Sequence, residues 1–197
     1  LVGAPSFDLH DAVEATGPQS RPALARTLQP TATPNADGMA YLFAHETYEI
    51  RIAAVRQLAD RDDIPVDWRT RLLVDALASE IAEPSSDAPP VPNAYLRPDE
   101  MARNLMIHSL VELGSEALVS VQAARDDADG PLRDCLLVAS AHLGDSAALP
   151  EVRLLVSASS DVVIRMNAAR ALGAAGDHEA IPELIGALED GTRIEAS

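Results

Sequence analysis

Apolar residues recur three and four positions apart in most of the chain from about residue 39 onward, which is the spacing of one helix face. The pattern is clearest when it is counted from Arg51, Arg103, Arg133 and Arg165, because the third, fourth and seventh positions after each arginine are almost all aliphatic. Each set predicts the buried stripe of an amphipathic helix. The aliphatic residues at these positions are Ala54, Val55, Leu58, Met106, Ile107, Leu110, Leu136, Leu137, Ala168, Ala169 and Leu172.

The arginines also mark an internal repeat. Arg103, Arg133 and Arg165 are spaced by 30 and then 32 residues, and each is followed eleven positions later by a glycine. The sequence "GDSAALPEV" (144–152) matches "GDHEAIPEL" (176–184) position by position, and an older copy begins at "RIAAVRQLADRDD" (51–63). Self-similarity at a period of this length is typical of a solenoid. The glycines are Gly114, Gly144 and Gly176.

Each part of the repeat has a predicted structural role. Asp129 and Asp161 precede apolar runs and can cap a helix N-terminus. The glycine ends that helix in a left-handed conformation, and Pro150 or Pro182 then fits the first turn of a second helix. Each unit is therefore two antiparallel helices joined by a tight turn, and it must stack on its neighbours to bury its apolar face.

Two other segments differ in composition from the repeats. Residues 1–38 are rich in Pro, Thr, Ala and Gly, so we expect an irregular N-terminal arm that caps the array, or else a linker. A proline-rich loop is predicted at 84–98 within the array, which spans 39–197. The tail 190–197 repeats the start of a first helix, so the array looks cut within a further repeat. Either that helix is a stub, or the sequence is a piece of a longer chain, which we favour.

The stretch "DVVIRMNAARALGAAGDHEAIPEL" (161–184) resembles the HEAT repeat, in the variety first noted in phycobilisome lyases. The resemblance is specific for 161–190, good for 99–160, weaker for 39–83 and absent from 1–38. It implies an all-α fold, a right-handed α-solenoid of about four helical pairs, in which the first helix of each pair lines the concave face. We expect inner helices at about 48–61, 98–113, 130–143 and 161–175, and outer helices at about 66–83, 115–126, 146–157 and 178–189.

The resemblance also implies a structural ladder. In HEAT repeats an aspartate before the inner helix and an arginine within it form a ladder between adjacent repeats. The residues that match this pattern are Asp99, Arg103, Asp129, Arg133, Asp161 and Arg165.

Offsets +1, +5 and +9 from each arginine point away from the apolar stripe, so they predict a strip on the concave face. The +5 positions are Arg56, His108, Val138 and Arg170, and the +9 positions are Asp60, Glu112, His142 and Ala174. The strip would bind an acidic or polar segment of a partner, or it is an ordinary solvated face. The predicted partner-binding residues are Arg56, Asn104, His108, Glu112, Asp134, His142 and Arg170.

Composition narrows the functional classes. The net charge is -16, which argues against nucleic-acid binding and against docking on anionic membranes. No apolar run is long enough to span a bilayer. Hydrophobic residues make up 47% of the chain but aromatic residues only 3%, so the core is aliphatic.

Little in the chain favours catalysis. There is no Lys, no glycine-rich phosphate loop, no CxxC and no GxSxG motif. His108, Glu112 and His142 lack a metal-site signature, and Cys135 lies in the apolar run "CLLVA", which favours a packing role. The sequence therefore predicts no enzyme, no cofactor and no metal.

The predicted function is a non-enzymatic scaffold for another protein, in a soluble, acidic chain whose location is slightly more consistent with the cytoplasm. The alternative is an accessory subunit or domain of a larger enzyme, such as a bilin-lyase-like chromophore-handling protein. A HEAT-like DNA glycosylase is excluded by the acidic charge. The sequence does not specify the partner, the compartment or the oligomeric state.

Overall fold

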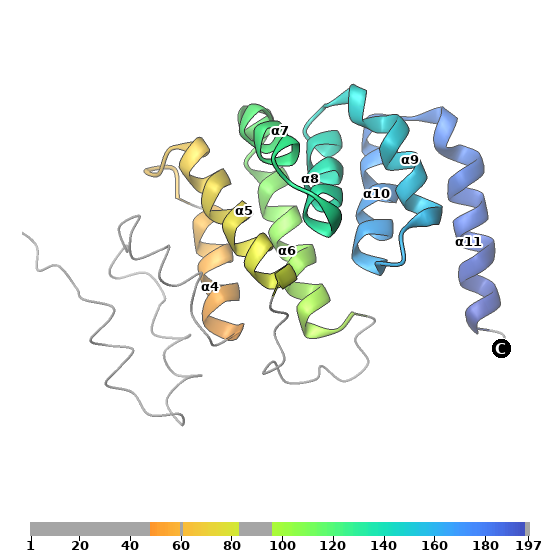
Figure 1. The fold of residues 1–197 in the computed structure, drawn as a ribbon, viewed down its shortest axis with the longest axis horizontal. Helices are drawn as coiled ribbons and strands as arrows, with labels where there is room; N and C mark the ends of the chain where they lie inside the picture. Colours follow the sequence, from red (N-terminus) through yellow and green to blue (C-terminus); the bar gives the residue numbers. More distant parts are fainter. Residues whose placement is uncertain (1–47, 60, 83–95, 196–197) are drawn as a thin grey trace, which may run out of the picture.

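The computed structural model describes residues 48–59, 61–82 and 96–195, and the elements in these ranges are all helical (Figure 1). Short 3₁₀ turns precede three of the outer helices, at Ser115–Ala117, Ser146–Ala148 and His178–Ala180. The inner helices are α4 (Tyr48–Ala59), α6 (Pro98–Glu112), α8 (Gly130–His142) and α10 (Val162–Ala175). The outer helices are α5 (Val66–Ala82), α7 (Leu118–Asp126), α9 (Leu149–Ala158) and α11 (Ile181–Glu195).

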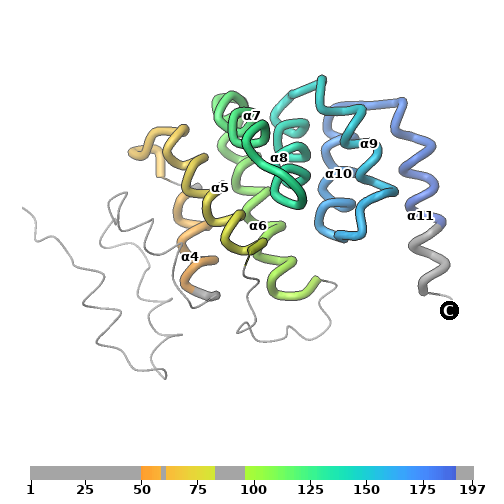
Figure 2. The backbone as a smooth tube through the Cα atoms, in the orientation of Figure 1, coloured from red at the N-terminus to blue at the C-terminus, as the bar shows by residue number. Residues whose placement is uncertain are grey.

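The helical pairs follow one another along the long axis of the molecule (Figure 2). Each inner helix packs against the next inner helix, and α5, α7 and α9 pack against α6, α8 and α10 of the following unit. This arrangement confirms the predicted all-α solenoid of about four helical pairs. The predicted N-terminal arm (1–38) and most of the proline-rich loop (84–98) lie outside the described residues.

Both ends of α10 have the predicted capping residues. The Asp161 carboxylate accepts hydrogen bonds from the backbone N–H groups of Val163 and Ile164, at 2.8 and 3.3 Å, and so caps α10. Gly176 ends α10 with φ 63°, a left-handed conformation that glycine adopts without a steric penalty. Asp129 occupies the same position before α8 but makes no capping hydrogen bond through its side chain.

The tail of the chain differs from the prediction. The expected start of another inner helix at 190–197 is absent from the described part, because α11 continues without a break from Ile181 to Glu195. The earlier outer helices are followed by non-helical residues, such as 159–161 after α9, before the next inner helix begins. No such break occurs at Gly191, which remains helical.

Helix α8 lies at the centre of the core. All residues from Cys135 to Ala141 are buried, although a helix at the surface would bury only one stripe. The reason is that α6 and α10 contact each other directly, while α7 and α9 also pack on α8. The inner helices α6, α8 and α10 therefore form one tightly packed group.

Candidate partner-binding surface

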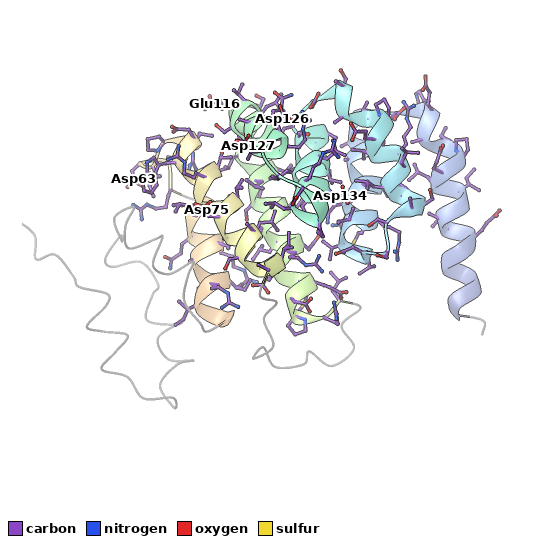
Figure 3. All side chains as sticks on the ribbon, in the orientation of Figure 1. Asp63, Asp75, Glu116, Asp126, Asp127 and Asp134 are labelled. Carbon is purple, nitrogen blue, oxygen red and sulfur yellow. The ribbon has the colours of Figure 1, made fainter. Side chains whose placement is uncertain are left out.

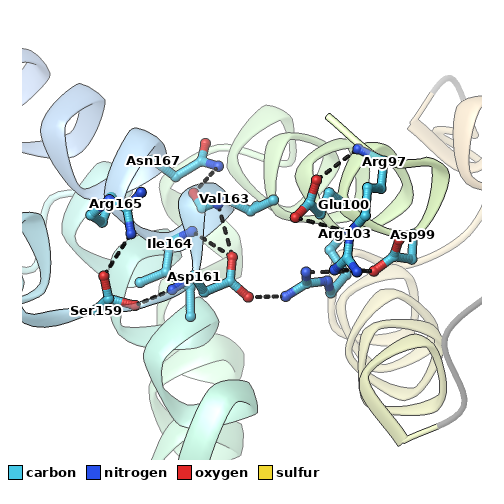
Figure 4. Close-up of polar contacts among 10 residues, drawn as sticks. All are labelled: Arg97, Asp99, Glu100, Arg103, Ser159, Asp161, Val163, Ile164, Arg165 and Asn167. Carbon is cyan, nitrogen blue, oxygen red and sulfur yellow. Dashed lines mark hydrogen bonds and ion pairs between the residues drawn. The ribbon is translucent and has the colours of Figure 1, made fainter. Parts of the chain in front are cut away.

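An ion pair joins two inner helices that are not neighbours in the repeat order. The Arg103 guanidinium on α6 donates a hydrogen bond to the carboxylate of Asp161, the N-cap of α10 (Figure 4). The Arg103 side chain is 10% exposed and that of Asp161 is 22% exposed. Beside this pair, Asn167 Nδ2 donates to Asn104 Oδ1 at 2.9 Å. These two contacts bridge α6 and α10 over α8, and we call them the α6–α10 bridge.

The ladder implied by the resemblance therefore takes a different form. Asp99 Oδ2 lies 3.9 Å from an Arg103 nitrogen, but the hydrogen bond of Arg103 crosses two units to Asp161. The other two arginines find local partners. Arg133 pairs with Glu151 on α9 at 2.7 Å, and Arg165 donates to the Ser159 carbonyl at 2.8 Å. Because α6 and α10 approach each other over α8, the carboxylate that accepts the hydrogen bond of Arg103 comes from Asp161, the N-cap of α10.

A second set of ion pairs, which the repeat pattern did not predict, connects the outer helices to the following turns. Arg125 at the end of α7 donates to Asp145 at 2.8 Å. Arg153 on α9 makes two bonds to Asp177, at 2.6 and 2.9 Å, and one to Glu179. The sequence did contain a signal for these pairs, because an aspartate follows the turn glycine in both matched copies, at Asp145 and Asp177. We call these contacts the outer ladder.

The structure separates the seven predicted partner-binding residues into two groups. Arg56, His108, Glu112 and Arg170 are exposed, and His142 is half-buried. His108 Nε2 lies 3.3 Å from Glu112 Oε1, so these two side chains form a pair on the surface of α6. The charges of His108 and Arg170 both act on His142, so side chains from α6, α8 and α10 lie near one another. We call these five residues the open strip.

The remaining two predicted residues lie where the inner helices meet. Asn104 is half-buried and accepts the hydrogen bond of Asn167 in the α6–α10 bridge. Asp134 is also half-buried, and burial raises the pKa of its carboxyl, with a smaller opposing effect of Arg133. Val138, at the +5 position of α8, is 0% exposed, so the expectation that this offset faces solvent is wrong there. The strip is thus interrupted at the middle of α8.

Acidic side chains occupy the outer side of the array. Asp75 lies on α5, Glu116 lies in the turn before α7, and Asp126 and Asp127 lie at the end of α7, and all four are exposed (Figure 3). The exposed arginines Arg56 and Arg170 lie on inner helices, and the exposed Arg71 lies on the outer helix α5.

The surroundings of Cys135 favour a packing role, and neither a metal-binding group nor a membrane-spanning helix is found among the described residues. Cys135 is completely buried as predicted, and burial raises the pKa of its thiol to about 12, so the thiol stays protonated. Among the described residues, no group of three or more His, Cys, Asp or Glu side chains could hold a metal ion. In the same part of the chain, no helix is long and apolar enough to cross a membrane.

The environment of His142 predicts that the free energy of unfolding depends on pH. Burial lowers the pKa of its imidazole below the usual 6.5, and the charges of His108 and Arg170 lower it further, while a hydrogen bond to the Asn167 backbone opposes them. The unfolded chain then binds a proton more readily than the folded chain. The stabilisation from neutral His142 is therefore complete above pH 6.5 and is lost as the pH falls through the lower folded pKa.

We expect His142→Gln to reduce the loss of unfolding free energy between pH 7.5 and pH 5, compared with the wild type. Urea titrations followed by circular dichroism at both pH values measure this difference. Carboxylates with lowered pKa values, such as Asp161 and Asp145, are common to both proteins and cancel. An equal loss in both proteins would show that His142 does not couple folding to protonation.

The fold and the paired contacts define an α-solenoid built from stacked helical pairs. The family described as HEAT repeats matches residues 119–196, which include α8 to α11 and most of α7. This part of the chain is therefore similar to HEAT repeats, and arrays of such repeats commonly serve as interaction surfaces for other proteins. Comparisons with curated proteins and with solved structures found no match.

Proposed function

We propose that this chain is a non-enzymatic scaffold that binds an acidic segment of a partner protein along the open strip. The observation that carries the proposal is the gathering of His108, His142 and Arg170 from three inner helices on a chain of net charge -16. Arg170 supplies a positive charge on this otherwise acidic protein, and the exposed His108 beside it supplies a polar ring nitrogen, so the two attract and orient an acidic segment.

The packing gives each residue of the open strip a role in this proposal. Arg170 and Arg56 are exposed and can donate bidentate hydrogen bonds to carboxylates. Glu112 holds the His108 imidazole at 3.3 Å and so fixes the direction of its second nitrogen. Asn104 and Asp134 lie at the edge of the strip, where a bound segment would meet the α6–α10 bridge. Because the inner helices are packed tightly, these positions are preorganised, which reduces the entropy lost on binding.

An alternative function for the same fold is a supporting role within a larger enzyme. The chain would then be an accessory subunit or domain of a larger enzyme, of the bilin-lyase-like kind that the repeat sequence resembles. Co-expression with a linear tetrapyrrole tests this alternative, because a chromophore-handling protein would acquire a visible absorption band.

We expect the variant His108→Ala/Arg170→Ala to lose a stoichiometric partner that the wild type captures from its native lysate. Its affinity should fall about tenfold or more, because a hydrogen bond to a charged group contributes about 1.5 kcal/mol or more. The matched control is Arg71→Ala/His178→Ala, which removes one exposed arginine and one exposed histidine elsewhere. Circular dichroism checks that both variants remain helical. Capture of the same partner by the strip variant would contradict the proposal.

A further inference from the structure

Asp129 occupies a capping position that it does not use. It is the N-cap of α8, but its side chain makes no capping hydrogen bond, and the residue is exposed. The residue after it is Gly130, and the same Asp-Gly pair recurs at 37–38 and at 190–191. Residues 37–38 lie outside the described part of the chain, so the structure compares the pair at 129–130 with the pair at 190–191.

An aspartate that precedes a glycine can react with its own backbone. The amide nitrogen of the glycine attacks the carbon of the side-chain carboxylic acid, the hydroxyl group and the amide hydrogen leave as water, and a five-membered succinimide ring forms. Water then opens the ring at one of its two carbonyl groups. Opening at the side-chain carbonyl restores aspartate, and opening at the backbone carbonyl gives isoaspartate, in which the main chain runs through the former side chain. Glycine favours the attack because it has no Cβ beside the nitrogen.

The backbone at 129–130 leaves this reaction open. Gly130 is the first residue of α8, so its N–H group has no acceptor within the helix. A Cβ placed on Gly130 would meet no heavy atom within 4 Å outside its own helix and chain neighbours, so the surroundings are open. Asp129 is extended, with ψ 171°, and the peptide group must rotate to bring the nitrogen to the carboxyl carbon. That rotation breaks the hydrogen bond from the Arg133 N–H to the Asp129 carbonyl, which is long at 3.3 Å.

The backbone at 190–191 is held by its helix. Both residues lie within α11, which continues to Glu195. In an α-helix the Gly191 N–H donates to the carbonyl four residues earlier, and the Asp190 carbonyl accepts from the N–H four residues later. The same rotation would break both of these bonds. The fold therefore hinders the reaction at Asp190, although the two dipeptides are identical.

We propose that Asp129 is a site of spontaneous isoaspartate formation, which the fold leaves reactive while it protects Asp190. The product inserts an extra methylene group into the main chain where the turn after α7 enters α8. It also carries a free α-carboxylate, the group that isoaspartyl methyltransferases recognise. This modification is independent of partner binding at the open strip.

The test incubates the folded wild type at neutral pH for several weeks, in parallel with the same chain unfolded in guanidinium chloride. Trypsin releases the two pairs in separate peptides, 126–133 and 171–193, because an arginine precedes and ends each one. Electron-transfer fragmentation in a mass spectrometer then measures isoaspartate at each position. The control variant is Asp129→Ser, since serine also suits an N-cap but cannot form the succinimide.

We expect the folded protein to accumulate several-fold more isoaspartate at Asp129 than at Asp190, and the unfolded chain to form similar amounts at both. Asp126 and Asp127 should remain unchanged, because neither precedes a glycine. Absence of isoaspartate at Asp129 in the folded protein would overturn the proposal, and so would the same ratio of the two positions in the folded and unfolded chains. Isoaspartate that persists in peptide 126–133 of Asp129→Ser would assign the reaction to another aspartate and would overturn it too.

Discussion

Replacing Val138 with aspartate should destabilise the chain by about 4 kcal/mol or more, because it buries an unpaired charge. Val138 is completely buried, and the residues on both sides of it along α8 are buried too. The group formed by α6, α8 and α10 leaves no route for water to the new carboxylate. A loss of this size approaches the whole stability of a typical domain, which is about 5–15 kcal/mol.

The control for Val138→Asp is Arg170→Asp, at the same offset on the next inner helix. Arg170 is exposed, so this change should cost less than about 1 kcal/mol. Urea unfolding followed by circular dichroism measures both variants. Similar losses in the two would mean that the middle of α8 is open to solvent, contrary to the packing described above.

Arg103→Ala should destabilise the chain by about 3 kcal/mol, because it leaves the Asp161 carboxylate without its partner in a partly buried site. The pair matters to both helices that it joins. The same carboxylate caps α10, and the Arg103 guanidinium lowers the pKa of Asp161 against the opposing effect of burial.

Arg133→Ala is the matched control for this prediction. Its partner Glu151 is 54% exposed, and an exposed pair contributes about 0–1 kcal/mol. Thermal and urea unfolding of both variants compare the two contributions. If Arg103→Ala cost no more than Arg133→Ala, the α6–α10 bridge would contribute nothing measurable to stability.

The helices could be predicted from the sequence because a period near 3.6 and the Asp, Gly and Pro signals agree at most helix ends. The inner helix expected at 161–175, for example, is observed as Val162–Ala175. The tail was predicted wrongly, because the sequence after Asp190 resembles the start of an inner helix but lacks the non-helical residues that separate an outer helix from the next inner helix.

The partner of Arg103 and the burial of Val138 depend on how the inner helices pack, which a pairwise alignment of repeats does not encode. The offset argument treated all inner helices as equally exposed. The run "CLLVASA" in α8 did indicate burial on all sides, since a helix that is apolar all round is normally buried. The proximity of His108, His142 and Arg170 required the same packing, although their offsets had placed them on one strip.

The most direct test of the proposed scaffold is to locate the partner on the surface by photo-crosslinking. Benzoylphenylalanine replaces either the exposed Ala174, one turn after Arg170 on α10, or the exposed Ala123 on the outer helix α7. In native lysate, the account predicts that the position on α10 forms a single strong crosslink to a partner segment rich in Asp and Glu. The position on α7 should form none. Crosslinks from Ala123 but not from Ala174 would contradict the central claim that the inner helices bind the partner.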